Sequence, residues 1–195
     1  MLRVDKTYTV AESQTLNNYI LNTTSQTTAV EYNKVKTLTF TNKIKEGQIK
    51  VVKVDKDENN IKLEGVKFII KDNNGNVVDT LTTDKNGEAV SKKLRVDRSY
   101  TVVEESTLST YILNTTPQTT TVEYNKVKTL TFINNHKLGN LKVFKVDKDN
   151  HKIPLGNVSF DVFSHEFQKV IGTYTTTVDG EILISDLRVR KLYID

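Results

Sequence analysis

The stretch Gly47–Asp55 reads GQIKVVKVD, and its alternation of apolar and polar residues predicts a β-strand with one face toward a core. Ile49, Val51 and Lys53 lie two residues apart, so the lysine shares a face with apolar neighbours. A similar stretch, GNLKVFKVD, follows at 139–147. A lysine on a core face is costly unless it is paired, so this pattern marks Lys53 as unusual.

The two stretches belong to an internal repeat with a spacing of about 92 residues. Residues 2–45 are roughly three quarters identical to residues 94–137, and residues 47–100 match residues 139–193 more weakly. Only the middle of the chain holds a whole unit. The predicted parts are the C-terminal half of a unit at 1–45, a complete unit at 46–137 and the N-terminal half of a unit at 138–195.

The complete unit alternates short period-two runs with turn sequences, which predicts an all-β fold of the β-sandwich type. Asp72–Gly75 and Asp84–Gly87 are turn sequences that supply positive φ at a glycine. No long stretch has helical periodicity. The predicted strands are 48–55, 66–71, 76–83, 88–93, 99–105, 110–123 and 126–134.

Composition excludes several classes of function. The net charge of +4 is spread over lysines interleaved with acidic residues, which argues against a nucleic-acid partner. There is no cysteine, and His136, His151 and His165 have no metal-ligand spacing. No apolar run is long enough for a membrane span. No nucleophilic triad or phosphate loop occurs, so we expect no cofactor, no metal and no enzyme with turnover.

Three polar residues share a predicted core face with apolar neighbours. They are Lys53 after Ile49 and Val51, Glu104 after Tyr100 and Val102, and Asn134 after Leu130 and Phe132. One interpretation is structural: a buried Lys–Glu ion pair with a hydrogen-bonded asparagine. The other is covalent, because burial favours the neutral amine and the neutral acid. A neutral amine can attack the asparagine carboxamide and expel ammonia, while the glutamic acid polarises the carbonyl and shuttles protons.

The pattern resembles the collagen-adhesin B-type (CnaB-like) domains of Gram-positive surface adhesins and pilins. The residues that carry the resemblance are Gly47-x-Ile49-x-Val51-x-Lys53-x-Asp55, Leu63-Glu64-Gly65-Val66-x-Phe68, Thr83-Asp84-x-x-Gly87-Glu88, Tyr100-x-Val102-x-Glu104 and Phe132-x-Asn134. The resemblance implies a CnaB-like sandwich with an intrachain isopeptide bond between Lys53 and Asn134, assisted by Glu104. It also implies an extracellular protein at a cell or spore surface.

The two half-units hold complementary parts of a second triad. The opening half has Glu12 and Asn42 in the positions of the acid and the acceptor, but no lysine strand, whereas the closing half has Lys145 alone. The connecting segments Lys43–Glu46 and Asn135–Leu138 look too short for one chain to close on itself. We therefore predict an interchain isopeptide bond from Lys145 of one copy to Asn42 of the next, with Glu12 as the proton shuttle.

This interpretation predicts a structural subunit that polymerises with copies of itself, head to tail, into an extracellular fibre or pilus-like appendage. Both ends interrupt a unit at the same place, Leu2–Val4 and Leu187–Val189, which favours native ends. The alternative is a repeat fragment, a stalk or adhesin module, of a larger cell-wall-anchored adhesin. A host matrix or a cell-surface anchor as a further partner rests on the family resemblance alone.

Overall fold

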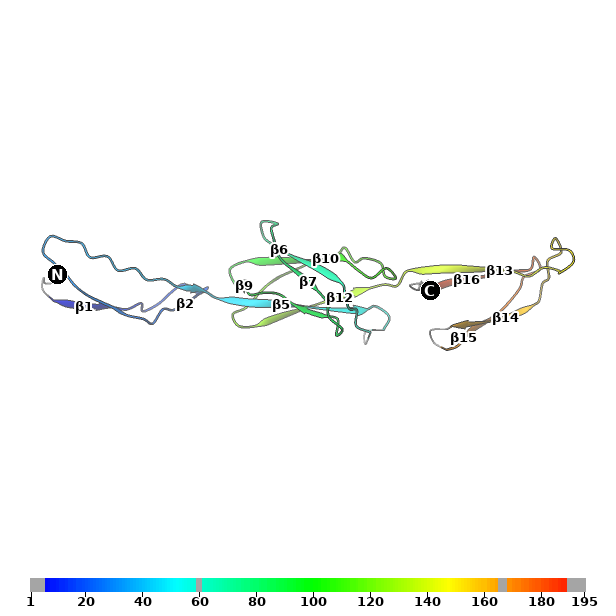
Figure 1. The fold of residues 1–195 in the computed structure, drawn as a ribbon, viewed down its shortest axis with the longest axis horizontal. Coiled ribbons are helices and arrows are strands. Elements are labelled where there is room, and N and C mark those ends of the chain that lie inside the picture. The colour runs from blue at the N-terminus through cyan, green and yellow to red at the C-terminus, as the bar shows by residue number, and fades with distance from the viewer. Residues whose placement is uncertain (1–5, 59–60, 165–167, 189–195) are drawn as a thin grey trace, which may run out of the picture. The chain divides into compact units, whose positions relative to one another are not determined.

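The computed structural model describes residues 6–58, 61–164 and 168–188. Every regular element in these ranges is a β-strand, which confirms the predicted all-β class (Figure 1). No helix in the described part of the chain could cross a membrane. The chain divides into two compact units, one made of Met1–Leu108 and Leu113–Asn134, the other of Ser109–Ile112 and Asn135–Asp195.

The complete repeat unit is a sandwich of two sheets. One sheet has the order β11-β10-β6-β7, and the other has the order β12-β5-β8 with β9 also paired to β5. The last strand, β12, runs parallel to the first strand, β5. The strands are β5 (Glu46–Asp55), β6 (Lys67–Asp72), β7 (Val77–Thr82), β8 (Glu88–Val90), β9 (Leu94–Arg95), β10 (Ser99–Ser106), β11 (Gln118–Thr121) and β12 (Val127–Asn134).

The core of this unit lies between the two sheets. Alternate residues of β5, β10 and β12 are buried, as the period-two pattern predicts. Phe68 of β6 and Phe132 of β12 meet across the sandwich with ring centroids 4.8 Å apart and both side chains buried. Lys53, Glu104 and Asn134 are buried with the apolar residues, so their predicted place on the core faces is confirmed.

One predicted strand is wrong for much of its length. Residues 110–123 contain β11 at Gln118–Thr121, and the segment before β11 is a loop. Asn114 bends this loop: its Oδ1 accepts the N–H of Thr116 at 3.0 Å, and its Nδ2 donates to the carbonyl of Ile133 at 3.1 Å. Pro117 follows and has no N–H for a ladder. Local side-chain hydrogen bonding therefore prevails over strand propensity here.

The opening half-unit forms only part of a sandwich. β1 (Thr7–Val10) pairs with β3 (Gln26–Ala29), and β2 (Tyr19–Ile20) pairs with β4 (Lys43–Ile44). Residues 35–42 correspond to β12 in the repeat, yet they form no strand. Two side-chain amides still hold this segment: Asn22 Nδ2 donates to Thr41 O at 3.1 Å, and Gln26 Nε2 donates to Thr39 O at 2.6 Å.

The closing half-unit repeats the other part. β13 (Leu138–Phe144) pairs with β16 (Glu181–Arg188), and β14 (Ser159–Ser164) pairs with β15 (Lys169–Thr175). The edge of β13 that corresponds to the β12-pairing edge of β5 has no neighbour among the described residues. The buried hydroxyl of Thr176 donates to Leu155 O and accepts from Val158 N, as Thr83 does with Leu63 and Val66. This half therefore folds locally like the complete unit.

We predict that Phe132→Ala lowers the free energy of unfolding of the complete unit by about 3–5 kcal/mol, because it removes a fully buried ring from the core. The matched control is Phe40→Ala, at the repeat counterpart of Phe132. Phe40 is half-exposed in the opening half, so its substitution should lower the free energy of unfolding by less than about 1 kcal/mol in dilute protein. Chemical denaturation of both variants measures the difference. Equal losses would contradict the view that the opening half lacks a closed core.

Candidate functional site

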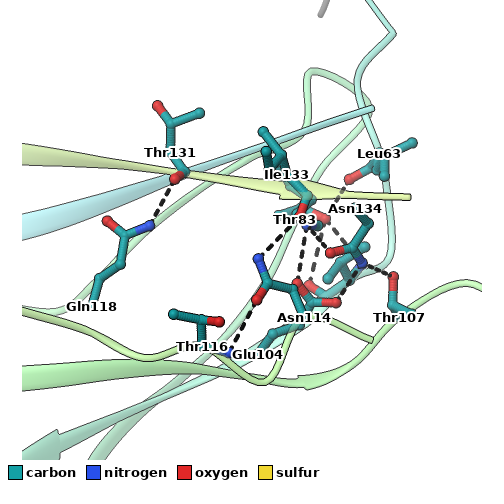
Figure 2. Close-up of polar contacts among 12 residues, drawn as sticks. Leu63, Thr83, Glu104, Thr107, Asn114, Thr116, Gln118, Thr131, Ile133 and Asn134 are labelled. Atoms are coloured by element: carbon teal, nitrogen blue, oxygen red, sulfur yellow. Dashed lines mark hydrogen bonds and ion pairs between the residues drawn. The ribbon is translucent and has the colours of Figure 1, made fainter. Parts of the chain in front are cut away.

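Three strands bring a lysine, a glutamate and an asparagine together inside the complete unit. Lys53 of β5 lies with its Nζ 2.6 Å from Asn134 Oδ1 and 3.0 Å from Glu104 Oε2. Asn134 of β12 donates from Nδ2 to Glu104 Oε1 of β10 at 2.6 Å (Figure 2). The three residues predicted from the sequence are therefore in mutual contact.

The site is dry. The side chains of Lys53 and Glu104 have no exposed surface, and Asn134 is 2% exposed. Burial lowers the pKa of Lys53, and the hydrogen bond and the negative charge of Glu104 only partly oppose this shift. A lowered pKa increases the fraction of neutral, nucleophilic amine.

The two oxygens of Glu104 face different partners. Oε2 lies beside the lysine amine, and Oε1 accepts from the asparagine NH2. The sequence interpretation assigned the acid to the asparagine carbonyl, but that carbonyl oxygen faces Lys53. The geometry thus favours a proton path from the amine to the amide nitrogen over polarisation of the carbonyl by the acid.

A fourth residue belongs to the site and was not predicted. Asn134 Nδ2 also donates to Thr107 Oγ1 at 2.8 Å, just beyond the end of β10 (Figure 2). Strand periodicity says nothing about a residue past the strand end. A signal was nevertheless present, because both repeats contain the spacing Glu-x-x-Thr, at Glu12–Thr15 and Glu104–Thr107, with different residues between.

The opening half contains the same acceptor arrangement without a lysine. Asn42 Nδ2 donates to Glu12 Oε1 and to Thr15 Oγ1. The hydrogen bond from Asn42, followed by the backbone N–H of Asn22 at 2.9 Å, lowers the pKa of Glu12 and keeps it a carboxylate. Asn42 Oδ1, whose counterpart accepts from Lys53, is buried and has no hydrogen-bond partner among the described residues.

A cavity of about 520 Å³ opens beside this acceptor. Polar and apolar residues of the opening half line it: Glu12, Gln14, Thr15, Leu16, Tyr19, Phe40 and Asn42. In the complete unit, the counterpart of Phe40 is Phe132, which packs on β6 and pairs with Lys53 of β5. The cavity therefore lies where the repeat would place the lysine strand.

Lys145 of the closing half has the backbone setting of Lys53. Its N–H donates to Gly180 O at 2.7 Å and its carbonyl accepts from Leu155 N at 2.9 Å, matching the bonds of Lys53 with Gly87 and Leu63. The side-chain amine of Lys145 has other partners than that of Lys53. Among the described groups, Lys145 Nζ donates only to Val146 O, at 3.3 Å. Each half thus presents one side of the site seen in the complete unit. In the described ranges, no His, Asp or Glu cluster could hold a metal ion.

Comparison with known families identifies the fold of the complete unit. Residues 47–136 match the SpaA family model, described as a prealbumin-like fold domain. The complete unit is therefore similar to SpaA-type prealbumin-like domains. This match confirms the predicted resemblance to the CnaB-like domains of pilins and surface proteins. A search of curated proteins found no match.

One solved structure shows the same fold over more of the chain, and others are similar at lower scores. The Bacillus anthracis TIE protein is 24% identical with a TM-score of 0.72, and the match covers 93% of this chain and 34% of that protein. The chain therefore spans about a third of that relative. A streptococcal ancillary pilin is 22% identical with a TM-score of 0.41, covering 93% of this chain and 63% of its own. GBS52, the minor pilin of Streptococcus agalactiae, is 22% identical with a TM-score of 0.42, and the match covers 68% of this chain and 61% of GBS52.

Proposed function

We propose that this protein is a self-assembling structural subunit of an extracellular fibre or pilus-like appendage. The closing half of one copy docks into the opening half of the next and becomes bonded to it. The buried, unpartnered Oδ1 of Asn42 is the observation that carries the proposal, because its counterpart in the complete unit accepts from a lysine amine. Lys145 is the repeat counterpart of that lysine.

The strand order supports docking of the halves. The complete unit needs the sheets β11-β10-β6-β7 and β12-β5-β8. The opening half holds the counterparts of β10, β11 and β12, namely β1, β3 and residues 35–42. The closing half holds the counterparts of β5, β8, β6 and β7, namely β13, β16, β14 and β15. Together the two halves contain every strand of the two sheets.

Exposed apolar surface supplies the driving force. Val10 is 44% exposed, whereas its counterpart Val102 is fully buried. Leu141 is also 44% exposed, whereas its counterpart Ile49 is fully buried. Burying a fully exposed side chain of this size contributes about 1.5–3 kcal/mol, and burying the exposed part of these two contributes a corresponding fraction. Docking would bury both residues in one sandwich core and would pair open strand edges.

The chemistry at each site is an amide exchange that releases ammonia. A carboxylate oxygen, Glu104 Oε2 within a chain or its counterpart on Glu12 between chains, accepts a proton from the lysine Nζ. The amine attacks Cγ of the asparagine, the new C–Nζ bond forms, and the Cγ–Nδ2 bond breaks. The acid returns that proton through Oε1 to Nδ2, which leaves as ammonia, and the carboxylate then takes up the second proton that Nζ loses as it becomes an amide nitrogen. Each site reacts once, so the protein is no enzyme with turnover.

Such an assembly is an open chain of copies. An opening half on one copy and a closing half on the next form a heterologous contact, which propagates as a filament unless the rotation closes a ring. The isopeptide bond then makes each contact irreversible. By its resemblance to pilin and adhesin domains, we place the fibre outside the cell, at a cell or spore surface, with copies of itself as the partner.

A second candidate is a repeat segment of a longer surface protein. The length of the TIE protein, of which this chain spans 34%, favours this candidate. Lys145 would then meet an acceptor in the next repeat of the same polypeptide. Host-matrix contact would rest on the family resemblance alone. The chemistry of the complete unit is the same in both candidates.

We predict that the wild-type complete unit lacks the mass of one ammonia when the denatured chain is weighed intact, because Lys53 and Asn134 have reacted. Glu104→Ala should restore the full mass by removing the proton carrier. Glu12→Ala, the matched variant in the opening half, should leave this intrachain loss unchanged. A wild-type chain of full mass after prolonged folding would refute the intrachain bond.

We predict covalent ladders on denaturing gels for the wild type and none for Glu12→Ala. Lys145→Ala lacks the donor and Asn42→Ala lacks the acceptor, so neither should form ladders alone. Their mixture should give a single dimer band, because only one donor and one acceptor remain competent. Monomers that have lost a second ammonia would instead indicate closure within one chain.

We predict that docking places residues 35–42 beside β13 in the register of β12 on β5. Thr131 pairs with Val52 in the complete unit, so Thr39 should pair with Phe144 of another copy. In a Glu12→Ala background, Thr39→Cys with Phe144→Cys should form reducible ladders, because neighbouring strands lie about 4.8 Å apart. Thr39→Cys with Lys142→Cys, two residues out of register, is the control. Equal ladders from both pairs would contradict this register.

A further inference from the structure

The amide acceptor has the same orientation in both sites, whether or not a lysine is present. In the complete unit, Asn134 Nδ2 donates to Glu104 at 2.6 Å and to Thr107 at 2.8 Å. In the opening half, Asn42 Nδ2 donates to Glu12 and to Thr15, and no described lysine is bonded to Asn42. The lysine is therefore not what orients the amide.

A carboxamide NH2 has two hydrogens, and each site provides two acceptors for them. With both hydrogens used, the carbonyl oxygen must point the other way. In the complete unit the carbonyl oxygen accepts from Lys53, whereas Asn42 Oδ1 is buried and accepts from no described donor. The threonine supplies the second acceptor in each case.

We propose that Thr15 and Thr107 are positioning residues for isopeptide formation: each hydroxyl holds the leaving NH2 group toward the acid and thereby presents the carbonyl to the incoming amine. This inference rests on the proposed function. It assigns to Thr15 the task of keeping the acceptor ready before a partner arrives.

The glutamate alone does not secure this orientation through the reaction. While it is a carboxylate, it can only accept, so it selects the NH2 group. Once it has taken the lysine proton it carries an O–H, which can donate to the carbonyl oxygen and favour a flipped amide. In the flipped amide, the leaving nitrogen would face the lysine. The threonine keeps its bond to the NH2 group during this step, because the hydroxyl does not change its charge.

Local structure supports a specific role for the hydroxyl. Thr107 lies directly after β10, so the strand that carries the acid also places the threonine. Thr15 and Thr107 are both only half-buried, and their hydroxyls contact the same amide nitrogen as the acid. Valine has the same shape as threonine without the hydroxyl, and serine keeps the hydroxyl, so the two substitutions separate shape from hydrogen bonding.

The test measures two rates on the full chain with the Thr39→Cys and Phe144→Cys pair as a docking reporter. Isopeptide formation is followed as non-reducible ladders, and docking as reducible ladders in the Glu12→Ala background. Thr15→Val should slow isopeptide formation roughly tenfold or more while the docking rate stays unchanged. Thr15→Ser should restore most of the rate.

Each contrary outcome has a distinct meaning. A wild-type rate in Thr15→Val refutes the positioning role and leaves the fibre proposal intact. Slow docking in Thr15→Val, or no rescue by Thr15→Ser, shows a structural role and also refutes it. Absence of ladders in the wild type refutes the fibre proposal itself. Thr107→Val, read as delayed ammonia loss from the complete unit, gives a second measurement should the Thr15 variant fold poorly.

Discussion

The buried amine of Lys53 is the constraint on which the rest of the structure depends. An ammonium group without water is costly, and Glu104 and Asn134 are the partners that offset the cost. They come from β10 in one sheet and from the last strand, β12, in the other, so the site can form only when both sheets have closed. The parallel pairing of β12 with β5 brings the last strand to the first. The polar cluster and the sandwich topology thus require one another.

The same constraint gives the two ends of the chain their complementary character. The opening half has an acid, a threonine and an amide in the same arrangement as in the complete unit, with one buried amide oxygen that lacks a partner among the described residues. The closing half carries Lys145 in the backbone setting of Lys53. A buried acceptor without a donor is unfavourable, and so are open strand edges and exposed apolar side chains. In the proposed assembly, one docking event would relieve all of these costs, with a second copy as the partner.

Much of this could be predicted from the sequence. Period-two alternation placed Lys53, Glu104 and Asn134 on core faces, because strand geometry alone decides which side chains share a face. The repeat spacing identified Glu12, Asn42 and Lys145 as their counterparts. Thr107 escaped prediction because it lies past a strand end, where periodicity carries no information. The predicted strand at 110–123 was too long, because the side chain of Asn114 competes for the backbone.

The sequence by itself determined the repeat, the all-β class and the residues that turn inward, since these follow from local spacing along the chain. Only the tertiary structure decided that the oxygens of Glu104 face the amine and the amide nitrogen, and that Asn42 Oδ1 is buried without a hydrogen-bond partner among the described residues. The reason is physical. Periodicity sets the direction of a side chain, whereas its rotamer and its partners are set by packing against segments distant in sequence.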